Sequence, residues 1–274
     1  MKTDIFPINF FKSFWLPKNV LKGRKDLNWF QIFIAVLFLN GLLMIPVSLH
    51  FSKMDAFPIE GSFPNAFELV DDSVWSQMEN ASFQNGQMEL TEGFYMEKPN
   101  GVVGGNLTET EVEEALKADN AILFLQEEMV IKEGDKATSN IRYTKDFSVE
   151  NVSNVEEFKQ AISEQWFYQN QTYVVGSMIF VVFILLLVNF LFIVLGSAFF
   201  VYLTRKSSSI KTFKESINLV LNAAGLSTVI SMIVGLISFD IITIILIQSF
   251  GLIFMLLAIF LSSRFQDEPI NSRK

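Results

Sequence analysis

Four long apolar stretches constrain what this chain can fold into. They are uncharged, contain between 21 and 31 residues each, and lie at 29–50, 173–203, 217–239 and 241–261. About 20 apolar residues in a helix cross the ~30 Å hydrocarbon core of a bilayer. The sequence therefore predicts four membrane-spanning helices, with the lipid bilayer as the first partner of the chain.

The charged residues between these stretches are sorted by sign. Residues 51–172 hold 23 acidic and 8 basic residues, whereas residues 1–28 hold 6 basic and 2 acidic residues. Residues 204–216 are also basic. Because basic loops stay on the cytoplasmic side of a membrane, we expect both termini to be cytoplasmic and residues 51–172 to lie outside.

The predicted fold class is an all-α bundle of four transmembrane helices, with an extracytoplasmic α+β domain inserted between the first and second helices. The segments are a cytoplasmic amphipathic, basic N-terminus (1–28), the first span (29–50), the acidic domain (51–172), the second span (173–203), a cytoplasmic basic loop (204–216), the third span (217–239), the fourth span (241–261) and a cytoplasmic tail (262–274).

Composition excludes several kinds of chemistry. The chain has no cysteine and one histidine, His50. Disulfides, thiolate nucleophiles and cysteine zinc sites are therefore ruled out, and a single imidazole makes no zinc site of the usual kind. Phosphate-loop, dinucleotide and nucleophile-elbow motifs do not occur either. We predict no catalytic residue, metal ligand or cofactor, and the residues that bind a ligand stay unassigned.

Local patterns predict the elements of the acidic domain. Apolar residues recur at helical spacing over 65–79, and Asn85-Gly86 is typical of a tight hairpin. The string Gly101–Gly105 indicates a flexible loop, and 121–125 a buried strand. Alternation over 141–149 indicates a half-buried strand.

Two capping patterns predict where helices of this domain begin. Thr108 with Glu111 opens a short helix that ends near Ala118, and Ser153 with Glu156 opens a last helix. That last helix leads almost directly into the second apolar run. We therefore expect one continuous helix over 155–203.

Clusters of carboxylates and exposed aromatics are weak signals of chemistry here. Glu111, Glu113 and Glu114 form one acidic group and Glu127 and Glu128 another, but carboxylates at this density are expected on any solvated acidic face. The same charge repels polyanions, so nucleic acid is excluded as a partner on that side. Trp75 and Trp166 lie on apolar helical stripes, which favours core packing over stacking on sugars.

Aromatic residues before the first span form one face of a short helix. Phe10, Phe11, Phe14 and Trp15 have the spacing for it, and Pro17 is expected to end it, with a basic linker following over 18–25. The segment lies either in the lipid headgroup layer or against the helix bundle. The pattern does not choose between these two positions.

Few polar side chains interrupt the spans. The set comprises Asn40, Asn189, Asn218, Asn222, Asp240 and Gln248. Ion-driven transporters place ionisable groups or broken helices inside the membrane, and this set indicates instead hydrogen bonds between helices. Pro46 is expected to kink or stop the first span near its outer end.

Two strings resemble a known family. Phe10-Phe11-Lys-Ser-Phe-Trp-Leu-Pro17-Lys18 followed by Arg24, and Thr212 to Thr228 at the entry of the third span, are similar to an uncharacterised bacterial family of four-span membrane proteins. Some of its members are named maltodextrose utilization protein MalA. Proline is common there near the position of Ser227, and this chain lacks it. The resemblance implies a protein of the bacterial plasma membrane linked with maltodextrin use.

Our main hypothesis is a non-enzymatic membrane protein that is accessory to maltodextrin utilisation or uptake, with membrane or carbohydrate-uptake proteins as partners. The alternative is a sensor or assembly module whose outer domain binds a ligand or protein and couples through the helix 155–203. An enzyme acting on exported polysaccharide is a third hypothesis, and no acid–base pair singles it out.

Overall fold

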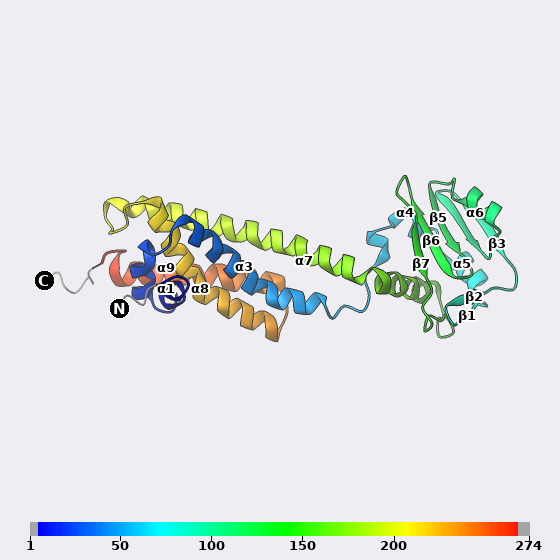
Figure 1. Ribbon diagram of the computed structural model, residues 1–274, viewed down its shortest axis with the longest axis horizontal. Helices are drawn as coiled ribbons and strands as arrows, with labels where there is room; N and C mark the ends of the chain where they lie inside the picture. Colours follow the sequence, from blue (N-terminus) through cyan, green and yellow to red (C-terminus); the bar gives the residue numbers. More distant parts are fainter. Residues whose placement is uncertain (1–4, 268–274) are drawn as a thin grey trace. The chain divides into compact units, whose positions relative to one another are not determined.

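The computed structural model describes residues 5–267 of the chain, and its contacts divide it into two compact units (Figure 1). The helix unit comprises Met1–Lys53 and Val175–Lys274, and the sheet unit comprises Met54–Val174. Parts of the predicted N-terminal segment (1–4) and of the predicted tail (268–274) lie outside the described residues.

Within residues 5–267, four helices are long and apolar enough to cross a membrane. They are α3 (Trp29–Phe51), α7 (Val155–Leu203), α8 (Phe213–Ile237) and α9 (Ile241–Ser263). Their positions confirm the four apolar stretches as helices. The prediction that 155–203 forms one helix is also confirmed, and only its part from Val175 belongs to the helix unit.

Residues at the helix ends explain where these helices begin. Asn28 and Gln31 form a reciprocal capping box at the start of α3, and Thr212 caps α8. Asp240 accepts a hydrogen bond from the Thr243 amide at 2.9 Å and so caps α9. Pro46 does not stop α3, which continues to Phe51, so that part of the prediction was wrong.

Small residues set the packing around α8, which contacts both α3 and α9. A side chain on Gly251 of α9 would meet Ser227 at 2.5 Å, and one on Gly235 of α8 would meet Ile244 at 2.8 Å. Close approach of helix backbones at small residues is the usual basis of helix association in lipid.

The N-terminal residues pack on the helix bundle. They form α1 (Ile8–Ser13), α2 (Pro17–Lys22) and the 3-10 turn η1 (Gly23–Lys25). Phe10 and Phe14 are buried, whereas Phe11 and Trp15 remain exposed. The expected basic linker is therefore helical, because Pro17 starts α2 at a position where its missing N–H costs nothing.

The sheet unit is built on a five-stranded sheet in the order β3-β4-β5-β6-β7. The strands are β3 (Phe94–Lys98), β4 (Gly101–Gly105), β5 (Asn120–Phe124), β6 (Glu128–Glu133) and β7 (Ser139–Arg142). Only β4 and β5 pair in parallel, and the helix α6 (Glu109–Ala115) connects them. A separate hairpin of β1 (Ser82–Gln84) and β2 (Gln87–Glu89) turns at Asn85-Gly86, as predicted.

Both faces of the five-stranded sheet are covered. Val102, Leu123 and Val130 pack with Ala115 of α6 on one face. The start of α7 contributes to the remaining core, where Phe158 lies 5.7 Å from the Phe124 ring and 5.3 Å from the Trp75 ring. Trp166 is buried as well, so core packing of both tryptophans is confirmed.

Three local predictions were wrong in detail. The helix expected over 65–79 is two helices, α4 (Pro64–Glu68) and α5 (Asp72–Met78), because Asp71 caps a new start. The loop expected at Gly101–Gly105 is the strand β4, buried between two neighbours. The cap expected from Ser153 and Glu156 is shifted by one residue, since Asn154 accepts from the Glu157 amide at 2.9 Å.

Two other local predictions were met in part. The helix opened by Thr108 is α6, but it ends at Ala115 rather than near Ala118. The half-buried strand expected over 141–149 is reduced to β7, which ends at Arg142. Beyond that strand, Tyr143 and Val149 are nevertheless buried.

Candidate functional site

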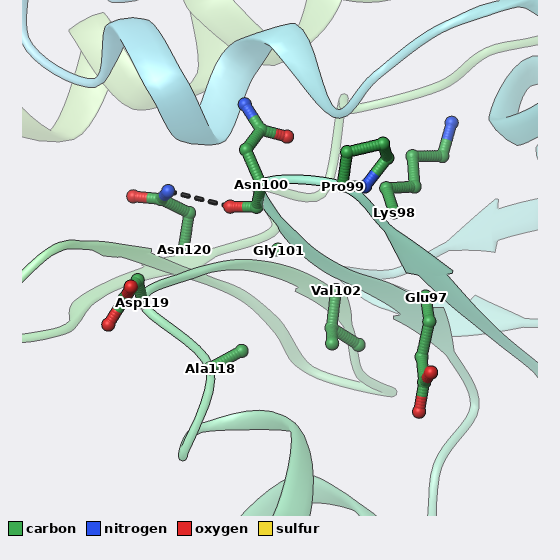
Figure 2. A pocket seen from close by; sticks show the side chains of 9 residues that line it. All are labelled: Glu97, Lys98, Pro99, Asn100, Gly101, Val102, Ala118, Asp119 and Asn120. Carbon is green, nitrogen blue, oxygen red and sulfur yellow. Dashed lines mark hydrogen bonds between the residues drawn. The ribbon is translucent and has the colours of Figure 1, made fainter.

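A polar pocket of about 520 Å³ in the sheet unit is the first candidate site (Figure 2). It lies where the turn between β3 and β4 meets the segment that leads into β5. Its lining residues are Glu97, Lys98, Pro99, Asn100, Gly101, Val102, Ala118, Asp119 and Asn120.

Asn120 fixes the shape of this pocket. Its buried amide donates to the Asn100 carbonyl at 2.7 Å, and its oxygen accepts from the Gly134 amide at 3.1 Å. A Cβ at Gly101 would lie 2.2 Å from the Asn120 carbonyl oxygen. Only glycine therefore permits this approach of β4 to β5, and both Gly101 and Asn120 line the pocket.

Lys98 is the single cation among the lining residues, and it is already paired. Its ammonium forms an ion pair with Asp71 and donates to the Ser73 hydroxyl at 3.1 Å. Partial burial alone would raise the pKa of Asp71, but hydrogen bonds from Lys98, Ser73 and Val74 outweigh it and lower that pKa to about 2. The pair thus orders the pocket rim rather than presenting a free charge.

The groups that remain available are acceptors. Glu97 and Asp119 are exposed, and in Figure 2 both carboxylates point to the same side of the strands, away from the Asn100 side chain. The lining residues include no Ser, Thr, Cys or His, so no hydroxyl, thiol or imidazole is present as a nucleophile or base. The pocket can accept hydrogen bonds from a polar ligand through these two carboxylates.

The acidic groups noted in the sequence are not brought together into a site. Glu111 accepts from the Thr108 amide at 2.8 Å, and Glu114 pairs with Lys117 at 2.5 Å. Glu128 accepts from the Asn140 amide group at 2.8 Å. Within residues 5–267, no group of three His, Asp or Glu side chains is arranged to hold a metal ion.

The sequence did not predict the role of one buried carboxylate, Glu133. Glu133 accepts hydrogen bonds from the Asn65 amide at 3.2 Å, the Asn65 side chain at 2.6 Å and the Ala66 amide at 2.8 Å. These donors belong to the first turn of α4, so Glu133 fastens that helix to the end of β6. Because 67 or more residues separate Glu133 from its hydrogen-bond donors, no local sequence pattern predicts this contact.

Polar side chains in the helix unit form the second candidate region. Asn40 donates to the Phe183 carbonyl at 3.3 Å, and Gln248 donates to the Thr228 hydroxyl at 3.1 Å. Asn218 donates to the Leu27 carbonyl at 3.0 Å. The Asn40 and Gln248 contacts bear out the expectation of hydrogen bonds between helices, whereas Asn218 bonds the connection before α3.

Two asparagines depart from that expectation. Neither polar atom of the buried Asn222 side chain has a hydrogen-bond partner among the described residues, and the same holds for the amide nitrogen of Asn189. His50, the other residue singled out at a helix end, stacks on Phe239 with ring centroids 4.0 Å apart. That arrangement fits a packing role for the imidazole.

Comparison with known proteins finds one family and two relatives. Residues 8–261 match the family described as "Protein of unknown function (DUF1189)". The chain is similar to Maltodextrose utilization protein MalA of Streptococcus pneumoniae (strain ATCC BAA-255 / R6), at 31% identity over 96% of this chain and 97% of that one. It is also similar to Putative maltodextrin utilization protein YvdJ of Bacillus subtilis (strain 168), at 26% identity over 93% and 89%. No solved structure matches.

Proposed function

Since the chain belongs to the DUF1189 family, we propose that it is a multi-pass protein of the bacterial plasma membrane that takes part in maltodextrin utilisation without catalysing a reaction itself. The observation that carries this proposal is the 31% identity to a maltodextrose utilization protein over almost the full length of both chains. Similarity of that extent includes the apolar helices and the acidic domain together, rather than one shared module.

Two features support an accessory rather than an enzymatic role. The polar pocket is lined by two exposed carboxylates, amides and one paired lysine, and it offers no hydroxyl, thiol or imidazole. Glu133 and Glu111 hold helix starts, and Glu114 pairs with Lys117. Partners of this role are membrane or carbohydrate-uptake proteins, which would meet either the helix unit within the membrane or the acidic sheet unit outside it.

The proposal is tested by deleting the gene in its bacterium. We expect slower growth on maltodextrins as the only carbon source and unchanged growth on glucose, with recovery when the intact gene is restored. Uptake of radiolabelled maltotriose separates a defect in entry from a defect in later use. Equal growth of the deletion and parent strains on maltodextrins would remove the pathway link.

The single helix α7 favours a second candidate function. Its first turns contribute Phe158, Ile162 and Trp166 to the core of the sheet unit, and its later turns contribute Leu186 and Phe190 to the helix unit. One continuous helix can pass a ligand-induced shift from an outer domain to the cytoplasmic side, as a sensor or assembly module requires.

The sensor or assembly function requires that α7 be continuous between the two units. Replacing Gln171 and Thr172 by Gly-Pro interrupts the helix between the two groups of buried residues. If coupling matters, the interrupted protein is inserted normally but fails to restore growth on maltodextrins. Full restoration by the interrupted protein would exclude coupling through α7 and leave the accessory role standing.

A further inference from the structure

A second polar cavity, of about 380 Å³, lies in the N-terminal part of the helix unit. Its walls come from α1, α2 and η1, which supply Lys12, Lys22, Asn9, Asn19 and Ser13. None of these residues takes part in the contacts on which the proposed function rests. The cavity therefore requires its own explanation.

Packing against α8 fixes this cavity in place. Phe14 is buried with its ring directly over Gly225, where any Cβ would lie 2.3 Å from the ring. Asn19 donates to the Lys12 carbonyl at 3.4 Å and so links α2 to α1. The two lysine backbones are consequently held by buried neighbours rather than by a loose chain end.

The cavity is lined by two lysines and one carboxylate, so its net charge is positive. Among the described residues no carboxylate oxygen lies within the 4.0 Å of an ion pair from Lys12 or Lys22, and both side chains are exposed. Asp26, which also lines the cavity, has an interaction of its own. By contrast the buried Arg24 is paired with Asp267 at 2.9 Å. The cavity thus presents two cations.

A buried amide backs the wall of the cavity. The side-chain nitrogen of Asn222 lies 2.7 Å from the place of a Cβ on Gly23, next to Ser13, and both Gly23 and Ser13 line the cavity. Both polar atoms of the Asn222 side chain lack a partner among residues 5–267. Asn222 lies behind the lining residues rather than among them, and it adds a polar group to the region beneath the cavity.

Apolar side chains flank the same segment. Ile8, Trp15 and Leu16 are each more than half exposed. The Phe11 ring lies 5.3 Å from the Phe38 ring of α3. The segment therefore lies beside the apolar helices rather than beyond their ends. Cations beside exposed apolar groups match the boundary between headgroups and acyl chains.

We propose that this cavity binds the phosphate-bearing headgroup of an anionic phospholipid. Lys12 and Lys22 contact the phosphate oxygens, while Ile8, Trp15 and Leu16 contact the acyl chains. The proposal rests on the membrane insertion included in the proposed function and is independent of the role in maltodextrin use. It assigns the N-terminal segment a defined lipid site rather than a diffuse attraction to the membrane surface.

The test uses the full chain, purified in a mild neutral detergent, and native mass spectrometry with added phosphatidylglycerol or phosphatidylcholine. We expect Lys12→Gln/Lys22→Gln to weaken phosphatidylglycerol binding about thirtyfold, because a basic residue at an anionic surface contributes roughly fivefold. Lys12→Arg/Lys22→Arg keeps the charge and retains binding. The matched control Lys206→Gln/Lys214→Gln removes two lysines elsewhere and changes binding less than about threefold.

Three results overturn the proposal. They are equal losses in the control and cavity variants, unchanged binding in the Lys12→Gln/Lys22→Gln variant, and displacement of the lipid by an equal concentration of inorganic phosphate. Extraction of membranes with alkaline carbonate tests membrane insertion separately from lipid binding. Release of the protein overturns membrane insertion and the lipid site together, whereas retention with no lysine effect overturns the lipid site alone.

Discussion

Three carboxylates of the sheet unit hold the first turns of three short helices. Asp71 accepts from the Ser73 amide at 3.0 Å, Glu133 accepts from the Ala66 amide at 2.8 Å, and Glu111 accepts from the Thr108 amide at 2.8 Å. Helices of five to seven residues are unstable alone, so such caps decide whether they form. The acidic composition of this unit therefore has a structural use at these three positions.

The Asp71–Lys98 pair gives a pH dependence at the residue scale. Its folded pKa of about 2 lies below the ordinary 3.8, so its stabilisation is complete above about pH 4 and is lost as the pH falls towards 2. Because the Asp71 side chain is 53% exposed, the contribution is about 1 kcal/mol or less. We expect Asp71→Asn to be less stable than the parent at neutral pH and nearly equal to it at pH about 2.

Hydrogen exchange of the α5 amides in the full chain, corrected for the intrinsic rate at each pH, measures this difference. Ser76→Ala, which removes an exposed side chain from the same helix, is the matched control and should show no pH-dependent difference. A gap between parent and Asp71→Asn that stays constant from pH about 5 to about 2 would contradict the assignment.

At the scale of elements, glycines determine which segments can pack closely against one another. Gly225 of α8 admits Phe14, and so positions α1 on the bundle. We expect Gly225→Ala to displace α1, at a cost of about 1–3 kcal/mol for overpacking, offset by up to about 1 kcal/mol of helix propensity. Exchange of the amides over residues 8–22 should accelerate, and quenching of Trp15 fluorescence should increase.

Gly196 of α7 supplies the control for this substitution. It also lies in a long apolar helix, but an added Cβ meets nothing within 4 Å. Gly196→Ala should leave residues 8–22 protected. If Gly225→Ala leaves them equally protected, Phe14 has room that the structure does not indicate, and the seating of α1 depends on other contacts.

The four long helices could be predicted from the sequence, because a segment in lipid must satisfy all its backbone hydrogen bonds within itself. The strand β4 could not. Gly101–Gly105 has the composition of a loop, yet a Cβ at Gly105 would meet the Phe94 ring at 2.5 Å. These glycines are required because residues of neighbouring strands pack directly against them. Local periodicity in the sequence carries no information about such contacts.

The same limit applies to the polar pocket. Asn100 and Asn120 lie 20 residues apart and meet only because β4 and β5 pair in parallel. Before that pairing is known, both asparagines look like ordinary loop residues. Core positions such as Trp75 and Trp166 were predictable because their helical stripes indicate burial without naming a partner.

At the scale of the whole molecule, the sorting of charge makes a single prediction about orientation. The acidic excess of 51–172 and the basic residues of 204–216 belong on opposite sides of the membrane. The sides of the turn between α8 and α9 and of the segment before α8 follow from this arrangement. Ser238 should lie on the side of the sheet unit, and Lys206 on the other side.

The absence of cysteine makes this orientation directly measurable, since every introduced thiol is the only one in the chain. We expect a membrane-impermeant maleimide to label Lys145→Cys and Ser238→Cys in intact protoplasts, and to label Lys206→Cys only after the membrane is permeabilised. All three positions are exposed, so accessibility within the protein does not limit the reaction. Labelling of Lys206→Cys in intact protoplasts, with Lys145→Cys protected, would invert the topology and place the acidic sheet unit in the cytoplasm.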